Sequence, residues 1–186
     1  RSYGDSAIQP NSTIDMSAMN KIEKFSEDTG ILSAQAGISI DKIIKTFLPL
    51  GWMLPVTPGS KFITLGGMIA SDVHGKNHHI DGSIANFIEE VSLIIDKQVI
   101  NCSINNNHKL FVDTIGGMGL TGTIIQAKIK LLKVSTSYIK QETIPTINLQ
   151  ETMEVFKKNL NAKYIVAWID CFTMGKNFGR SIIFKG

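Results

Sequence analysis

The chain has 186 residues, 43% of them hydrophobic, with 19 basic and 16 acidic side chains and a formal net charge of +3. This length and composition suit one substantial domain, or one domain and part of another. No run of Lys or Arg is long enough to follow a phosphate backbone, so we expect no nucleic-acid partner. Lys45, Pro49 and Pro55 interrupt the longest apolar stretch, so we expect no transmembrane segment.

The chain begins at Arg1 without a starting Met or a basic-then-apolar leader, which indicates an internal segment of a longer protein. Two expected locations therefore stay open: the protein is cytoplasmic, or it is associated with the periphery of a membrane. Cys102 and Cys171 stand far apart with no CxxC motif. This spacing favours two ordinary thiols over a disulfide or a thiolate zinc site, and we expect no metal.

The first half of the chain predicts a loop, a strand and a helix in that order. Residues 1–14 lack helical or strand periodicity, whereas residues 30–37 have the pattern of a short strand. Asp41 is the predicted N-cap of a helix that ends at Gly51. Its predicted inner face carries four hydrophobic residues, Ile43, Ile44, Phe47 and Leu48. Residues 54–83 follow as a long, irregular segment, which is typical of a functional loop.

The second half is richer in strand patterns. Residues 91–102 predict a hairpin with its turn at Asp96 and Lys97, and residues 123–131 alternate as a strand whose inward side chains are Ile125, Ala127, Ile129 and Leu131. Residues 151–160 predict a helix with Met153, Phe156 and Leu160 inward, and residues 164–170 predict a strand that carries Trp168. The break in pattern at residues 135–148 predicts a domain boundary.

Three segments are rich in glycine or small polar residues, namely residues 1–7, 58–70 and 116–122. Glycine admits positive φ and lets an anion approach backbone N–H groups, so such loops can hold phosphate oxygens. Gly117, Gly119 and Gly122 match the GxGxxG dinucleotide fingerprint, but that motif must open a helix, and here a strand pattern follows. The sequence therefore argues against a Rossmann unit, and no GxxxxGK[ST] phosphate loop is present.

Three histidines could suggest a metal site. His74 and His78 are four residues apart and would share the face of a helix. Gly75, Lys76 and Asn77 between them argue against a helix, so a structural or loop-capping role is predicted for His78 and His79.

The string PGSKFITLGGMIASDVHGKNHHIDGS at residues 58–83 resembles the FAD-binding domain of the vanillyl-alcohol oxidase superfamily, also called the p-cresol methylhydroxylase type. RSYGDS at residues 1–6 and GGMGLTG at residues 116–122 agree in order and spacing, and are most similar to the decaprenylphosphoryl-ribose oxidase branch. Aldonolactone oxidases, such as D-arabinono-1,4-lactone oxidase, resemble it more distantly. The implied fold class is α+β, a mixed sheet with flanking helices.

The resemblance implies that two loops hold the FAD pyrophosphate from two sides, mostly through backbone N–H groups. Ser71 to His74 would lie along the flavin, and Thr123 against the adenine. The cofactor-binding residues it implies are Arg1, Ser2, Tyr3, Gly4, Asp5, Ser6, Gly59, Thr64, Leu65, Gly66, Gly67, Ser71, Asp72, Val73, His74 and Thr123. His74 aligns with the histidine that carries covalent FAD in aldonolactone oxidases, although the closer branch has no such bond, and both alternatives stay open.

Two residues are implied on the substrate side. The Lys76 ammonium would bind a sugar hydroxyl or phosphate oxygen, with a solvated surface lysine as the alternative. The Trp168 indole would lie against a sugar ring, with a half-buried strand aromatic as the alternative. The family's catalytic base comes from a C-terminal half that is absent from this sequence, so no base is named.

The predicted organisation is a PCMH-type FAD-binding domain at residues 1–134, truncated in its first small subdomain, followed by the start of a substrate domain at residues 135–186. The predicted activity is FAD-dependent oxidation of a CH–OH group of a sugar or polyol derivative, free or lipid-linked, by hydride transfer to flavin N5. This segment alone is expected to be inactive. The alternatives are an aldonolactone oxidase type and a non-catalytic FAD-binding module. A partner reductase or epimerase is a further expectation.

Overall fold

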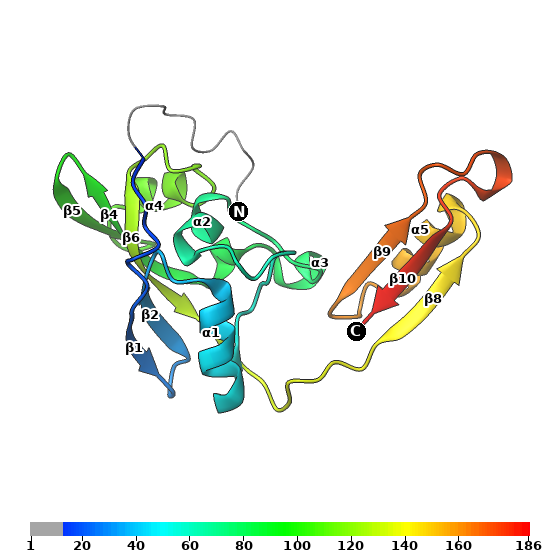
Figure 1. Ribbon diagram of the computed structural model, residues 1–186, viewed down its shortest axis with the longest axis horizontal. Helices are drawn as coiled ribbons and strands as arrows, with labels where there is room; N and C mark the ends of the chain where they lie inside the picture. The colour runs from blue at the N-terminus through cyan, green and yellow to red at the C-terminus, as the bar shows by residue number, and fades with distance from the viewer. Residues whose placement is uncertain (1–12) are drawn as a thin grey trace. The chain divides into compact units, whose positions relative to one another are not determined.

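A computed structural model describes residues 13–186, and the predictions made for residues 1–12 lie outside this range. The described chain forms two compact units (Figure 1). The first contains residues 13–75 and 83–137, and the second contains residues 76–82 and 138–186. The chain therefore enters the second unit twice, first through a short internal segment and then through its C-terminal part.

The first unit is built on a five-stranded sheet with the order β1 (Ile22–Ser26), β2 (Ile31–Gln35), β6 (Thr123–Lys130), β4 (Ile88–Ile95) and β5 (Gln98–Ser103). The α+β class is confirmed. All strand pairs among the described residues are antiparallel, in place of the mixed sheet that was expected. Two of these pairs, β1–β2 and β4–β5, join through short turns, which suffice for antiparallel neighbours but not for parallel ones.

Short helices and a small second sheet complete the first unit. The helices are α1 (Ile40–Phe47), η1 (Leu48–Leu50), α2 (Leu65–Ala70), η2 (Ile84–Phe87) and α4 (His108–Thr114), and β3 (Trp52–Met53) pairs with β7 (Leu132–Lys133). The hydrophobic core joins the sheet to α1 and α2. Its largest fully buried side chains are Leu32, Ile38, Ile40, Ile43, Leu65, Met68, Ile69, Ile84, Leu93, Ile129 and Leu131.

The N-cap of helix α1 lies two residues before the predicted cap. The Ser39 hydroxyl, not the Asp41 carboxylate, accepts the Lys42 N–H at 3.2 Å. Asp41 lies in the first turn and pairs with Lys45 at 2.7 Å and Lys61 at 3.1 Å. An acidic residue is favourable at both positions because both lie near the positive end of the helix dipole, so the sequence alone did not separate cap from first turn.

The predicted hairpin is confirmed as β4 and β5, with Asp96 at φ +47° and Lys97 at φ +66° in a two-residue turn. The predicted strand at residues 123–131 is confirmed as β6, but its inward set differs at one end. Ile124 is 7% exposed whereas Ile125 is only partly buried. The pairing of β4 with β6 shifts register between Ser92 and Leu93, and this irregularity changes which side chain faces the core.

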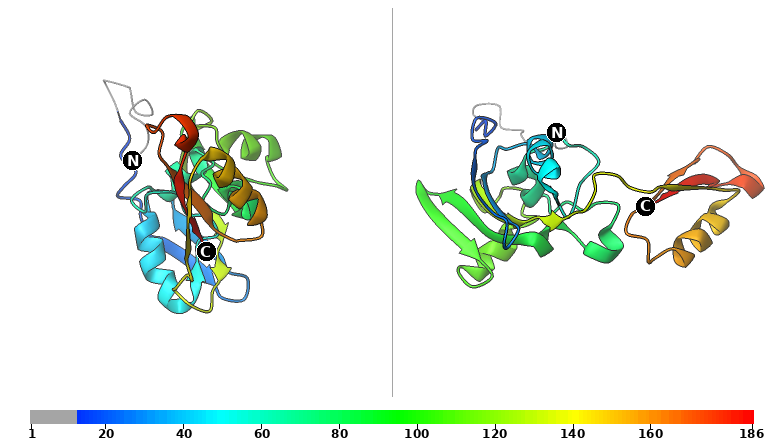
Figure 2. Two further views of the ribbon diagram at one scale, coloured as in Figure 1. Left: turned by 90° about the vertical axis from the view of Figure 1, so that its right-hand side faces the viewer. Right: turned by 90° about the horizontal axis from the view of Figure 1, so that it is seen from below.

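The second unit is a three-stranded antiparallel sheet with the order β8 (Glu142–Thr146), β10 (Ser181–Lys185) and β9 (Ile165–Ile169). It also contains α3 (His78–Asp81), α5 (Leu149–Lys158) and η3 (Gly175–Asn177). Figure 2 shows α5 lying along one face of this sheet.

The contact between α5 and its sheet is polar at its centre. The hydroxyls of Thr146, Thr152 and Ser181 form a buried triangle with three oxygen distances of 2.7 Å. The prediction that Met153 and Leu160 point inward is wrong, because they are 52% and 57% exposed. Hydrophobic spacing misplaced the inner face since Thr152, a polar residue, occupies it.

The loop that joins β9 to β10 is organised by one carboxylate. Asp170 accepts hydrogen bonds from the Thr173 hydroxyl at 2.6 Å, the Phe172 N–H at 2.9 Å and the Arg180 guanidinium at 2.9 Å. The Thr173 hydroxyl, the Phe172 N–H and then the Arg180 cation hold the pKa of the Asp170 carboxyl well below its ordinary value.

Replacing Asp170 with asparagine should destabilise the second unit at neutral pH, lowering its unfolding temperature by a few degrees. A carboxyl with a lowered folded-state pKa adds stability that is fully present above its unfolded value of 3.8 and is lost as the pH falls further. The difference in unfolding temperature between wild type and Asp170→Asn should thus be constant from pH 7 to about pH 5, and it should become smaller below about pH 4. Thermal unfolding across this pH series measures it, and a gap that stays constant to pH 3 would contradict the assignment.

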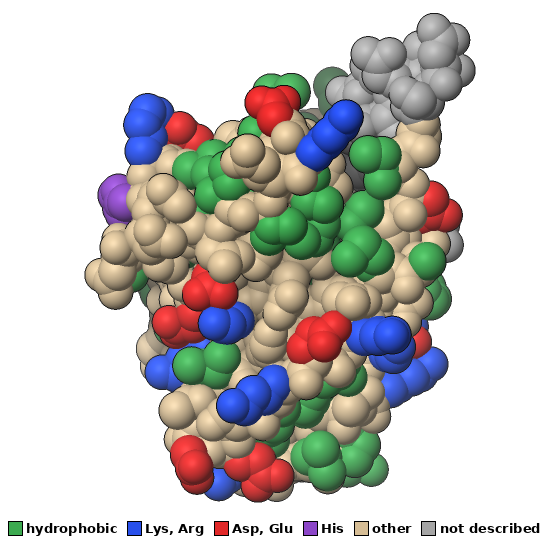
Figure 3. Space-filling view, turned by 90° about the vertical axis from the view of Figure 1, so that its left-hand side faces the viewer, with side chains coloured by type: hydrophobic (Ala, Val, Ile, Leu, Met, Phe, Trp, Pro, Cys, Tyr) green, Lys and Arg blue, Asp and Glu red, His purple; other side chains and the backbone are tan. Residues whose placement is uncertain are grey.

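The outer surface of the first unit is mixed in character. Seen from the side of the β4–β5 hairpin, hydrophobic side chains lie among charged and polar ones (Figure 3). Large exposed hydrophobic residues of β4, β5 and α4 and of the turn after β5 are Ile94, Val99, Ile104 and Val112. Within residues 13–186 no helix has the length and apolar character needed to cross a bilayer.

Candidate functional site

Helix α2, in the middle of the glycine-rich segment, packs directly on the end of β2. The Leu65 N–H donates to the Ile38 carbonyl at 2.9 Å, and the Gly66 N–H donates to the Ala36 carbonyl at 2.7 Å. A Cβ at Gly66 would lie 2.9 Å from the Ala36 Cβ, closer than such atoms normally approach. Glycine is therefore required at residue 66 for packing, and the N–H groups of Leu65 and Gly66 already have partners within the protein.

The loop before α2 offers donors of a different kind. Its backbone N–H groups at Gly59, Ser60, Lys61, Ile63 and Thr64 donate to no acceptor within residues 13–186. Gly59 is exposed and would have nothing within 4 Å of an added Cβ. Several N–H groups in one exposed loop suit an anion such as a pyrophosphate. The residues present thus fit the phosphate group of FAD, because the N–H groups of this loop, unlike those of Leu65 and Gly66, have no acceptor within residues 13–186.

Thr64 connects that loop to the helix. Its hydroxyl accepts the Gly67 N–H at 3.2 Å and caps α2. Gly67 is exposed, in contrast to the buried Gly66. The two adjacent glycines therefore have different surroundings: one contacts the sheet, and the other leaves the outer side of the helix open.

The segment after α2 is fixed by hydrogen bonds to the helix. The N–H groups of Ser71, Asp72 and Val73 donate to carbonyls within α2, and the Asp72 carboxylate accepts the Ala85 N–H at 3.1 Å. Asp72 has φ +40°, a left-handed conformation that is uncommon outside glycine. His74 follows in an extended bridge to Ser83 and has an exposed side chain.

The third glycine-rich string lies against the C-terminal end of α2. The Gly116 N–H donates to Ile69 at 3.0 Å, and the Met118 N–H donates to Ala70 at 2.8 Å. The structure thus brings the third glycine-rich string into direct contact with α2, which lies within the predicted cofactor segment. Helix α4 precedes this string and β6 follows it, beginning at Thr123, so the argument against a Rossmann unit is confirmed.

The histidines do not assemble a metal site in the part of the chain that the structure describes. No group of three His, Cys, Asp or Glu residues suited to a metal ion occurs among residues 13–186. His74 lies outside any helix and His78 begins α3, so they share no helix face, as the intervening glycine predicted.

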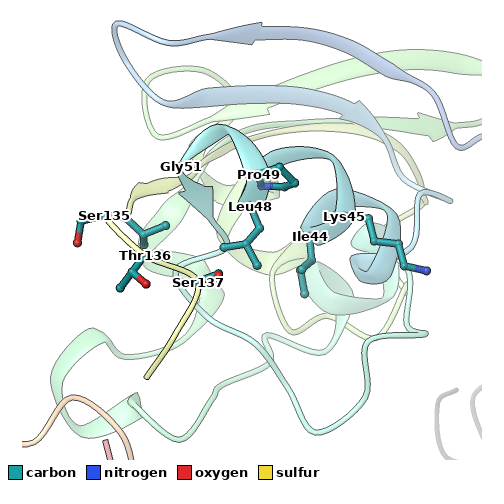
Figure 4. Close-up of a pocket in the computed structure, with 9 residues that line it drawn as sticks. Ile44, Lys45, Leu48, Pro49, Gly51, Ser135, Thr136 and Ser137 are labelled. Atoms are coloured by element: carbon teal, nitrogen blue, oxygen red, sulfur yellow. The ribbon is translucent and has the colours of Figure 1, made fainter. Parts of the chain in front are cut away.

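A surface hollow of the first unit contains none of the predicted site residues. It has a volume of about 640 Å³ and lies between α1–η1 and the chain that follows β7 (Figure 4). Its lining residues are Ile44, Lys45, Leu48, Pro49, Gly51, Val134, Ser135, Thr136 and Ser137. No residue implied for FAD or substrate contributes to it.

The two residues predicted on the substrate side both belong to the second unit. Trp168 is 73% exposed and makes an edge-to-face contact with Phe184, with ring centroids 6.0 Å apart. The alternative of a half-buried aromatic is therefore wrong. Lys76 is also exposed, and its carbonyl accepts the Ile165 N–H of β9 at 3.1 Å. Strand β9 thus carries Trp168 and holds the backbone of Lys76.

Sequence reasoning missed two features of this site. The donors of Ser60, Lys61 and Ile63 were not predicted, although a polar, glycine-bearing run before an N-capping threonine is a recognisable pattern. The placement of residues 76–82 in the second unit was also missed. No local pattern indicates it, because its partners are more than 80 residues away in the sequence.

The family model described as FAD binding domain matches residues 1–102, more than half of the chain. The chain therefore belongs to the FAD-binding family of the p-cresol methylhydroxylase type, as its three glycine-rich strings indicated. Its cofactor is FAD.

Among known proteins, the decaprenylphosphoryl-beta-D-ribose oxidase of Mycolicibacterium smegmatis is 35% identical over all of this chain and 42% of its own length. An uncharacterized protein in the mprA 5' region of Streptomyces coelicolor is 31% identical over 78% of the chain and 40% of its own length. A D-lactate dehydrogenase of Anaerostipes hadrus is 22% identical over 74% of the chain and 30% of its own length. The chain thus spans less than half the length of these curated relatives.

Proposed function

We propose that the intact protein is an FAD-dependent oxidoreductase that oxidises a CH–OH group of a sugar or polyol derivative, in the manner of a decaprenylphosphoryl-ribose oxidase. The observation that carries this proposal is the 35% identity to such an oxidase, which extends over all of this chain. Two of the relatives described above have names that state a reaction, an oxidase and a dehydrogenase, which supports redox chemistry.

In this proposal each segment of the first unit has a distinct task. The loop at residues 59–64 holds the pyrophosphate through its N–H groups. The family resemblance assigns residues 1–6 to the same pyrophosphate. Ser71 to His74 flank the flavin, and Thr123 lies against the adenine. Bound FAD supplies a hydride acceptor at N5. Residues 1–134, apart from residues 76–82, are thus assigned to the FAD-binding domain.

The second unit contributes substrate contacts. The Lys76 ammonium makes no ion pair with any described residue, which leaves it available to a phosphate or hydroxyl oxygen. The exposed Trp168 indole offers a flat apolar surface to a sugar ring. Residues 135–186 are assigned to the beginning of a substrate domain, and the internal segment that carries Lys76 belongs with them.

The test uses the intact protein. Purified or FAD-reconstituted protein should show the visible absorbance bands of a flavin, and a lipid-linked pentose phosphate should bleach them under anaerobic conditions. Protein that takes up no FAD would refute the cofactor assignment. Protein that holds FAD but is bleached by no sugar or polyol in a substrate panel would instead be a non-catalytic FAD-binding module.

One further measurement decides the state of His74. Its exposed side chain would be accessible to a flavin bound beside it, so the structure is compatible with either alternative. Denaturation should release FAD into the supernatant if the protein follows the decaprenylphosphoryl-ribose oxidase branch. Flavin fluorescence that stays with the polypeptide would favour the aldonolactone oxidase type, with its histidyl-linked cofactor.

A further inference from the structure

The segment at residues 76–82 is attached to the second unit by contacts that concentrate on one short stretch, residues 162–165. The His79 Nε2 lies 2.9 Å from the Ala162 carbonyl. Asp81 pairs with Lys163 at 3.5 Å, and the Lys76 carbonyl accepts the Ile165 N–H at 3.1 Å. The side chains of His79 and Asp81 and the backbone of Lys76 therefore attach residues 76–82 to a stretch that lies more than 80 residues later in the sequence.

The same segment is stiffened from within. Asn77 is only 1% exposed, and its amide donates to the Asp81 carboxylate at 2.5 Å. The Asp81 carboxylate thus joins Asn77 to Lys163. Residues 78–81 form α3, whose N–H groups at Ile80 and Asp81 donate to the Asn77 carbonyl. A rigid, tied segment of this kind fixes the backbone from which Lys76 projects.

Among these contacts, the hydrogen bond of His79 defines which ring nitrogen carries the proton. A carbonyl only accepts hydrogen bonds, so Nε2 must carry the proton that is donated to Ala162. Nδ1 is buried and has no hydrogen-bond partner among the described residues. The bond to Ala162 is therefore the only one that this ring makes within residues 13–186, and it depends on a single nitrogen.

We propose that His79 is a positioning residue for Lys76: by fastening residues 76–82 to the β9 end of the second unit, it keeps Lys76 and Trp168 on one structural body. This inference rests on the proposed function, which assigns both residues to substrate binding. Its consequence is that loss of the His79 contact weakens substrate binding without altering the FAD site.

Because only Nε2 of His79 makes a hydrogen bond, two substitutions form a matched pair that can be tested in the intact holoprotein. In His79→Gln the side-chain amide nitrogen can occupy the place of Nε2 and still donate to Ala162, whereas the shorter His79→Asn cannot reach it. We expect His79→Asn to raise KM roughly five- to tenfold with kcat changed by less than about twofold. The reason is that a loosened Lys76 loses substrate binding that contributes equally to the ground and transition states. His79→Gln should stay within about twofold of wild type in both constants.

Two controls separate positioning from general damage. His108→Asn makes the same substitution at an exposed residue of α4 and should change neither constant. In a Lys76→Gln background His79→Asn should raise KM no further, because a residue that acts through Lys76 has nothing left to position. The proposal would be overturned if His79→Asn raised KM by the same factor in the wild-type and the Lys76→Gln backgrounds. It would also be overturned if His79→Gln raised KM as much as His79→Asn.

Hydrogen exchange provides a readout that needs no substrate. The Ile165 N–H, which donates to the Lys76 carbonyl, should exchange faster in His79→Asn than in wild type and His79→Gln. If no sugar or polyol bleaches the wild-type flavin, the proposed function fails, and this exchange rate still decides whether His79 fastens the segment. Unchanged exchange in His79→Asn would refute the fastening role even in an active enzyme.

Discussion

Gly66→Ala should lower the stability of the first unit by about 1–3 kcal/mol, the usual cost of forcing a methyl group into a packed contact. The added Cβ would lie 2.9 Å from the Ala36 Cβ and 3.2 Å from the Ala36 carbonyl oxygen. Both atoms belong to a rigid strand end, so α2 must move. Its movement would break the Gly66 hydrogen bond to Ala36 and disturb the loop that precedes it.

The neighbouring glycine supplies the control for this prediction. Gly67 is exposed, and the nearest atom to an added Cβ is the Thr64 hydroxyl at 3.2 Å, which is the end of a side chain. Because alanine is favoured over glycine within a helix by up to about 1 kcal/mol, Gly67→Ala should leave stability equal or slightly raised. Thermal unfolding and bound-flavin content of the intact protein measure both variants. A Gly66→Ala protein as stable as wild type would contradict the packing argument.

Lys76→Gln should raise KM for a phosphorylated substrate by about tenfold or more, because a hydrogen bond to a charged group contributes roughly 1.5–3 kcal/mol. The substitution removes the charge and keeps a polar, somewhat shorter side chain. FAD content should not change, since Lys76 belongs to the second unit whereas the loop proposed to bind the pyrophosphate belongs to the first. Steady-state kinetics together with the flavin spectrum of the same preparation measure this split.

Two comparisons make the Lys76 result specific. Lys24→Gln makes the same change at an exposed residue of β1 and should have no effect on KM. High salt should reduce the difference between wild type and Lys76→Gln if the ammonium binds a phosphate, because mobile ions screen an exposed ion pair. If Lys76→Gln left KM unchanged, the alternative would hold, and Lys76 would be a solvated surface lysine without a role in substrate binding.

Strand patterns were predicted well because each depends on neighbours along the chain. The hairpin at Asp96 and Lys97 and the strand at residues 123–131 alternate clearly, and both were found. Errors arose where a contact with a distant strand decided the outcome. The register shift beside Ser92 moved Ile124 into the core, and the hydroxyl triangle placed Thr152 on the inner face of α5.

The cofactor site shows a similar division. The glycine-rich string at residues 58–83 and its match to an FAD-binding family could be recognised from residue identities alone, because chain geometry needs glycine at fixed positions. The string did not reveal which of its N–H groups were already used. Leu65 and Gly66 donate to the carbonyls of Ile38 and Ala36, which follow β2, and only the folded chain brings those carbonyls to α2.

By itself, then, the sequence determined the family, the cofactor and half of the ten strands that residues 13–186 form. The tertiary structure alone decided that Gly66 packs against Ala36 and that Lys76 belongs with β9. It also decided that five N–H groups of the loop before α2 have no acceptor within residues 13–186. The physical reason is range: turn chemistry and alternation act between neighbours, whereas packing and hydrogen-bond satisfaction depend on residues that folding brings together.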